Sequence, residues 1–106
     1  MLDKFEILDI LKKQKPFLRD KFNVKEIGLF GSYARNEATN KSYIDFLIEL
    51  FPNTENYIET KEALRKYLRK LFGKNIDLAN PRSLKPHFKN RILKQAVYGM
   101  NMMKQK

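Results

Sequence analysis

The sequence predicts a mixed α/β (α+β) fold in which a small β-sheet of about three to four strands packs with helices. Apolar residues recur at helical spacing near both ends of the chain and in its middle. Short apolar runs, of a length typical of buried strands, separate these segments. A length of 106 residues suits one modest core, so we expect a single domain over residues 1–106.

The first helix is expected over Leu2–Phe22. We expect Pro16 to break or kink it, because proline removes a backbone donor and clashes with the preceding turn. The residues at helical spacing that should cover the core are Phe5, Leu8 and Leu11, with Ile7 and Ile10 beside them.

Two further helical segments and three strands complete the prediction. A second helix is expected from about Asn56 to Phe72, with Gly73 as its stop, and a last helical region from Pro86 to about Met102. The expected strands are Val24–Phe30, Ser42–Leu50 and Asn75–Leu78.

Two of the expected strands carry an acid inside an apolar run, Asp45 and Asp77, whereas Glu49 falls near a strand end where its charge can reach water. Burying an unpaired charge is costly, so an acid in such a position usually serves a metal ion, a partner charge or catalysis. The alternative is that each acid pairs with a basic residue, such as Arg35 or an arginine of the last helix.

Gly31 and Ser32 follow the first strand and can open a short helix whose free N–H groups bind an anion. Glycine allows close approach to the backbone, and serine can cap the helix or donate its hydroxyl. The alternative is a plain helix cap. Arg35 could reach a bound phosphate or brace Glu37 or Asp45, and the sequence does not separate these roles.

Twenty-two basic and 12 acidic residues give a formal charge of +10, which permits attraction to RNA, DNA, nucleotides or an acidic protein. The alternative is a solvated basic surface. The absence of cysteine excludes disulfides and thiolate zinc sites, and the single histidine, His87, suggests a surface or packing role. No apolar run is long enough for a membrane span, and the N-terminus lacks a signal-peptide layout, so we expect a cytoplasmic protein.

The stretch from Ile27 to Ile48 resembles the G-S-x10-D-x-D signature of nucleotidyltransferases with the polymerase-beta-like fold. The residues that flank the motif are similar to those of the minimal nucleotidyltransferases, or MntA-like antitoxins: Ala34-Arg35, Glu37-Ala38-Thr39 and Ser42. The resemblance covers nearly the whole chain and implies this fold for it.

The resemblance also implies a set of site residues and ligands. Asp45 and Asp77 would be catalytic and would bind Mg²⁺, while Gly31, Ser32 and Arg35 would bind the phosphates of ATP or another nucleoside triphosphate. Family members that act as antitoxins adenylylate a tyrosine of a HEPN-domain toxin, which makes such a toxin the expected partner.

The sequence departs from the family motif at Tyr43, which replaces the first acid of the D-x-D pair. Residues two apart in a strand share a face, so the family pair can hold two divalent ions together. Tyrosine has an ordinary pKa of about 10, and its neutral phenol is a poor ligand for Mg²⁺. We therefore expect weakened activity.

Two classes of function follow from these residues. The chain could be an enzyme that transfers a nucleoside monophosphate from a triphosphate to a hydroxyl, aided by two metal ions. Alternatively, it could be a catalytically inactive binding module of the same fold, acting as an antitoxin or as a nucleotide or RNA binder.

Overall fold

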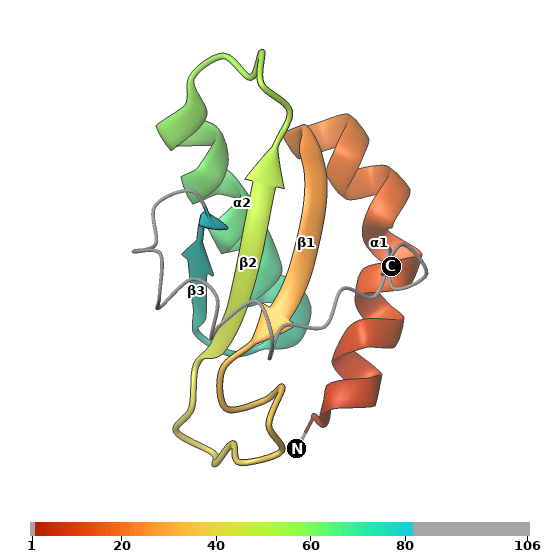
Figure 1. Cartoon of the computed structure of the whole chain (residues 1–106), viewed down its shortest axis with the longest axis vertical. Coiled ribbons are helices and arrows are strands. Elements are labelled where there is room, and N and C mark those ends of the chain that lie inside the picture. The colour runs from red at the N-terminus through yellow and green to blue at the C-terminus, as the bar shows by residue number, and fades with distance from the viewer. Residues whose placement is uncertain (1, 82–106) are drawn as a thin grey trace.

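The computed structural model describes residues 2–81, which form a three-stranded sheet and two long helices (Figure 1). The predicted mixed α/β class is confirmed, and the two long helices and the three strands expected in this part of the chain are present. The predicted helical region from Pro86 to Met102 lies outside the described residues, as does His87. The elements are α1 (Lys4–Phe22), β1 (Val24–Phe30), β2 (Ile44–Leu50), α2 (Tyr57–Phe72) and β3 (Ile76–Ala79).

The sheet has the order β1-β2-β3, so β2 is its central strand. β1 runs antiparallel to β2, whereas β3 runs parallel to it after the chain has crossed over through α2. In this register Phe30 lies opposite Asp45 on one side of β2, and Asp77 lies opposite Asp45 on the other.

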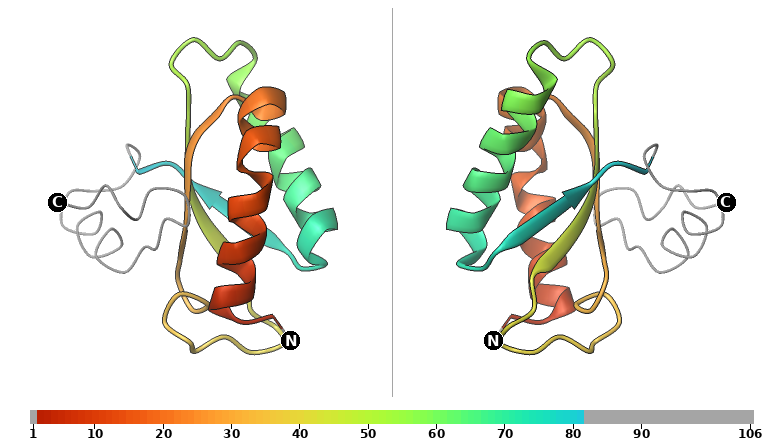
Figure 2. Two further views of the ribbon diagram at one scale, coloured as in Figure 1. Left: turned by 90° about the vertical axis from the view of Figure 1, so that its right-hand side faces the viewer. Right: turned by 90° about the vertical axis from the view of Figure 1, so that its left-hand side faces the viewer.

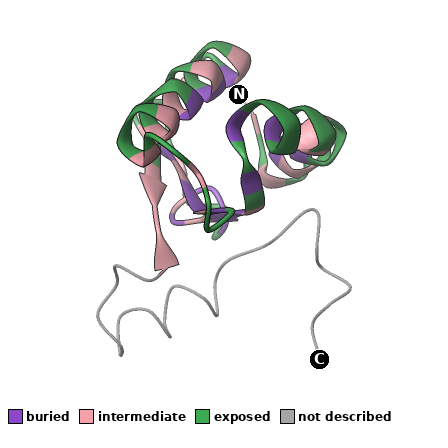
Figure 3. Ribbon diagram, turned by 90° about the horizontal axis from the view of Figure 1, so that it is seen from above, coloured by how far each residue is buried: buried purple, intermediate pink, exposed green. Residues whose placement is uncertain are grey.

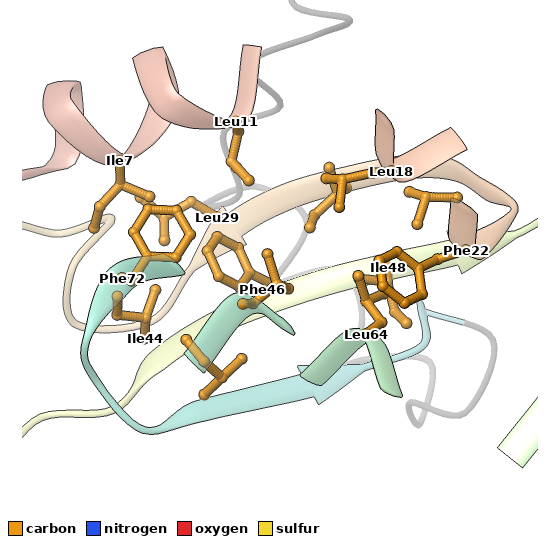
Figure 4. Packing of buried hydrophobic residues seen from close by; sticks show 14 of the residues in the cluster. Ile7, Leu11, Leu18, Phe22, Leu29, Ile44, Phe46, Ile48, Leu64 and Phe72 are labelled. Atoms are coloured by element: carbon orange, nitrogen blue, oxygen red, sulfur yellow. The ribbon is translucent and has the colours of Figure 1, made fainter. Parts of the chain in front are cut away.

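Both helices cover the same face of the sheet (Figures 2 and 3). Alternate residues of β2 join the hydrophobic core: Ile44, Phe46, Ile48 and Leu50. Figure 4 shows the first three of these at close range, among residues of the two helices. Because side chains alternate along a strand, Asp45, Leu47 and Glu49 point to the opposite face. The sheet thus has one face for the core and a second face that carries the acids.

The buried face of α1 differs from the predicted one. Ile7, Leu11 and Leu18 are buried, whereas Phe5 is 71% exposed. Ile7 and Leu11 are four residues apart and share one face of the helix. Phe5 precedes Ile7 by two residues, about 200° around the axis, and therefore points to solvent.

Pro16 does not break α1, contrary to one form of the prediction, because the helix continues through it to Phe22. Pro16 and Lys12 are both exposed. The Lys12 carbonyl, which lacks an amide donor from Pro16, lies on the solvent side, where water can satisfy it.

The helix ends have local causes. α1 begins with a capping box that the sequence analysis missed: the Glu6 amide donates to Asp3 Oδ1 at 2.9 Å, and the Asp3 amide donates to Glu6 Oε1 at 3.0 Å. α2 ends at Gly73, with φ of +69°, which confirms the predicted stop. Neither of these two helices has the length and apolar character needed to cross a membrane.

Candidate active site

The structure brings the two predicted acids together. Asp45 and Asp77 are the second residues of β2 and β3 and lie directly opposite each other in the parallel ladder. Both side chains therefore point to the face of the sheet away from the helices. Asp45 is half-buried beside this partner, whereas Asp77 is exposed to solvent.

The pKa of Asp45 is raised from 3.8 to about 6, chiefly by burial and then by the charge of Asp77 and a hydrogen bond with it. The positive charge of Arg35 acts against this rise. Two ionised carboxylates on directly paired residues repel each other, and a cation between them would relieve the repulsion. The pair is thus a point of concentrated negative charge once both groups are ionised.

Gly31 lies against Asp45 in a backbone conformation that favours glycine. Its φ is +78°, and a Cβ atom at this position would overlap Oδ2 of Asp45 and lie 3.0 Å from its Cγ. Any other residue would displace the carboxylate. Gly31 and Asp45, both expected in the site, therefore lie against each other.

The short helix predicted to begin at Gly31 is wrong, because residues 31–36 form successive turns. The Arg35 amide donates to the Gly31 carbonyl at 3.1 Å, and the Glu37 amide donates to the Ser32 carbonyl at 2.8 Å. Asn36 then adopts a left-handed conformation, with φ of +62°, which stops a helix from propagating. Ser32 is half-buried within these turns. Because no helix begins here, Ser32 is not a helix cap, and no helix dipole acts at this position.

Arg35 forms an ion pair with Glu37 and also influences the pKa of Asp45. Its Nε donates to Glu37 Oε1 at 3.0 Å, while its charge lowers the pKa of Asp45. Between residues 2 and 81 neither Asp45 nor Asp77 forms an ion pair with a basic side chain. The alternative pairing with an arginine of the last helix lies outside the described residues.

Tyr43 precedes β2 and is 47% exposed. Arg65 of α2 lies near Tyr43. The pKa of Arg65 is raised mainly by its hydrogen bond with Glu62, and the charges of Asp77 and Tyr43 raise it further. In the described part of the chain no three acidic, histidine or cysteine residues gather into a metal site. The donor set is therefore the two carboxylates, which suits Mg²⁺ only when substrate phosphates complete its shell.

The sequence analysis missed two residues that shape the loop before β2. Lys74 donates from Nζ to the Asn40 carbonyl at 2.7 Å and lies 6.0 Å from the ring centroid of Tyr33. Tyr33 is buried, and its hydroxyl has no hydrogen-bond partner among the described residues. A lysine directly after a helix-stopping glycine gives no sequence signal for this role.

The sequence of this chain is similar to those of known nucleotidyltransferase-family proteins. A family model described as a nucleotidyltransferase domain matches residues 11–98, and the chain belongs to this family. The protein adenylyltransferase MntA of Thermococcus cleftensis is 40% identical over 100 residues, which cover 92% of this chain and 97% of that protein. MJ0128 of Methanocaldococcus jannaschii, provisionally named a protein adenylyltransferase, is 45% identical over 94 residues, with 88% and 94% covered.

Solved structures share the fold. One, provisionally described as a minimal nucleotidyltransferase, superposes with a TM-score of 0.73 at 25% identity and covers 91% of this chain and 95% of its own. A toxin–antitoxin structure with AMP-PNP has a TM-score of 0.64 at 24% identity, covering 82% and 69%. A tri-AMPylated HEPN toxin of Shewanella oneidensis in complex with its MNT antitoxin gives 0.61 at 19%, covering 92% and 75%.

The carboxyl of Asp45 should titrate near pH 6 in the metal-free protein, as followed by carbon-detected NMR. Asp77→Asn should lower this midpoint, because it removes a neighbouring charge, whereas Asp20→Asn on α1 should leave it unchanged. The Asp45 carboxyl binds its proton more tightly in the folded state, with a pKa of about 6, than in the unfolded chain, with a pKa of 3.8. Its contribution to stability should therefore fall as pH rises from about 4 to about 6. A midpoint that Asp77→Asn does not move would contradict the pairing.

Gly31→Ala should destabilise the protein more than Gly73→Ala, as measured by urea unfolding. Both glycines have positive φ, which costs an alanine about 1–2 kcal/mol, but only residue 31 would overlap Asp45. Overpacking should add about 1–3 kcal/mol at residue 31. Most of this excess should vanish in an Asp45→Ala background, and equal losses in the two single variants would contradict the contact.

Proposed function

We propose that this protein transfers AMP from ATP to a hydroxyl of a HEPN-domain toxin and thereby acts as the antitoxin of a two-protein system. The observation that carries the proposal is the Asp45–Asp77 pair, held in register beside Gly31. The names of its relatives, which include a protein adenylyltransferase, support the chemistry. The toxin complexes among its structural neighbours support the partner.

In the proposed reaction Asp45 and Asp77 would hold Mg²⁺, with the triphosphate oxygens as its other ligands. The bound metal would supply charge neutralisation at the phosphorus and the leaving pyrophosphate. Ser32 could offer its hydroxyl to a phosphate and Arg35 adds positive charge near Asp45, whereas the room at Gly31 is taken by the Asp45 carboxylate. Because a carboxylate must be ionised to bind metal, Asp45 should be ready for this role only above about pH 6.

Tyr43 lowers the expected rate in this proposal. The exposed phenol stands where the family places an acid, and the described residues offer no third carboxylate beside the pair. Losing one strong electrostatic contributor commonly costs about 10² to 10³ in rate. This same observation favours the second candidate, a binding module of the family that holds the toxin without turnover.

Incubation with labelled ATP, Mg²⁺ and the toxin encoded beside this gene should place label on the toxin. Asp45→Asn and Asp77→Asn should each reduce the labelling about 10²-fold or more, because each removes a metal ligand. Asp9→Asn, the same change at an exposed site on α1, is the matched control and should label at the wild-type rate. A stable complex that carries no label would identify the binding module instead, and no complex at all would refute both candidates.

Tyr43→Asp should strengthen Mg²⁺-dependent binding of ATP, as measured by calorimetry. It restores a carboxylate beside the pair, and even the loss of an outer-shell partner typically costs about 10–100-fold in metal affinity. Tyr43→Phe should bind ATP as the wild type does, since it adds no ligand. Equal, tight and metal-dependent binding by wild type and Tyr43→Asp would show that residue 43 does not contact the metal.

A further inference from the structure

A buried leucine lies on the side of the sheet that carries Asp45 and Asp77, which we call the acid face. Leu47 points to this face and is 0% exposed, yet it does not belong to the core cluster that the helices cover. Its cross-strand neighbours are Gly28 on β1 and Ala79 on β3. Glycine has no side chain and alanine has only a methyl group, so these neighbours cannot cover a leucine.

The described elements leave the cover of Leu47 unexplained. Side chains stand roughly perpendicular to a sheet, so the tip of Leu47 loses contact with water only when other atoms lie above it. Both α1 and α2 lie on the other side of the sheet (Figures 2 and 3). The connections of residues 31–43 and 51–56 lie at the two ends of β2, whereas Leu47 is its middle residue (Figure 1). The cover therefore has to come from beyond residues 2–81.

The charges on the acid face restrict what can cover it. Asp45 and Glu49 flank Leu47 at a distance of two residues, about 7 Å along β2, and point to the same face. Glu26 of β1 lies opposite Glu49. Asp77 of β3 lies opposite Asp45. Burying a carboxylate is costly unless it meets an opposite charge, so a fitting cover is apolar at its centre and basic around it.

Residues 82–106, which follow β3 closely, have this pattern. In the helical region predicted for residues 86–102, apolar side chains recur at every fourth position: Phe88, Ile92, Ala96 and Met100. At 1.5 Å per residue a helix of this region is about 25 Å long, close to the span of about 23 Å for the seven residues of β2. The segment contains no acid, and its basic residues are Arg82, Lys85, Lys89, Arg91, Lys94, Lys104 and Lys106.

We propose that residues 82–106 pack on the acid face, with the apolar positions of the predicted helical region over Leu47 and basic side chains beside the surrounding carboxylates. The segment then forms one wall of the candidate active site, because Asp45 lies next to Leu47 on this face. Asp77 is exposed, so the site stays open on the side of β3. This packing needs neither ATP nor metal and does not rest on the proposed adenylyl transfer.

A second copy of the chain fits the acid face less well. Two copies joined through this face would bring one set of carboxylates against an identical set, and like charges brought together across an interface are costly. The segment of residues 82–106 offers the opposite charge and is attached to the edge of the same sheet.

Thiol labelling of single-cysteine variants of the whole chain tests the proposal, since the chain has no cysteine of its own. The thiol in Leu47→Cys should react about tenfold or more slower than the thiol in Ile58→Cys, because residue 58 is 77% exposed. Adding Ile92→Asp should remove most of this protection, because it places a charge in the proposed contact. Adding Asn90→Asp is the matched control. It introduces the same charge about 200° around the predicted helix and should leave the protection intact.

Leu11→Cys, in the core on the helix side, separates local from global opening, and its thiol should stay protected when Ile92→Asp is added. Four outcomes would overturn the proposal. Fast reaction in Leu47→Cys alone would mean that the acid face is open. No effect of Ile92→Asp would mean that another molecule or segment covers it. Protection that grows with protein concentration would identify a second copy, and equal loss of protection at positions 11 and 47 would mean that Ile92 supports the whole fold.

Discussion

The parallel pairing of β2 with β3 is the constraint on which the site depends. It places Asp45 and Asp77 directly opposite each other, so two like charges share one face of the sheet. The fold accepts this repulsion because the acids lie on the face away from the helices, where Asp77 reaches solvent. A one-residue slip of β3 would turn Asp77 into the core and would break the pair, so register and chemistry are inseparable here.

The two faces of the sheet have different roles: one packs the core, and the other carries the acids. The helix side is a continuous apolar core built from α1, α2 and alternate residues of all three strands, and it supplies most of the stability. The other side can therefore carry a half-buried acid of raised pKa at tolerable cost. Gly31 adds to this arrangement because its lack of a side chain leaves room for the Asp45 carboxylate.

Much of this fold could be predicted from the sequence, because its signals are local. Strand alternation around Asp45 and the glycine after α2 indicated the elements directly, and the spacing of Gly31 and Asp45 indicated the family. The errors arose where context overrides local preference. Pro16 is tolerated because its side of α1 faces water, and Asn36 ends the turn after Gly31 before a helix can form. The contact of Lys74 with the Asn40 carbonyl escaped notice because the two residues come from separate segments of the chain.

The position of Tyr43 just outside β2 has a consequence for how such proteins diverge. Its side chain is about half exposed and belongs to neither the ladder nor the core. Exchanging an acid for a phenol there alters the electrostatics of the neighbouring carboxylates while leaving the packed interior untouched. In this architecture the residue at position 43 can therefore change at little cost to folding.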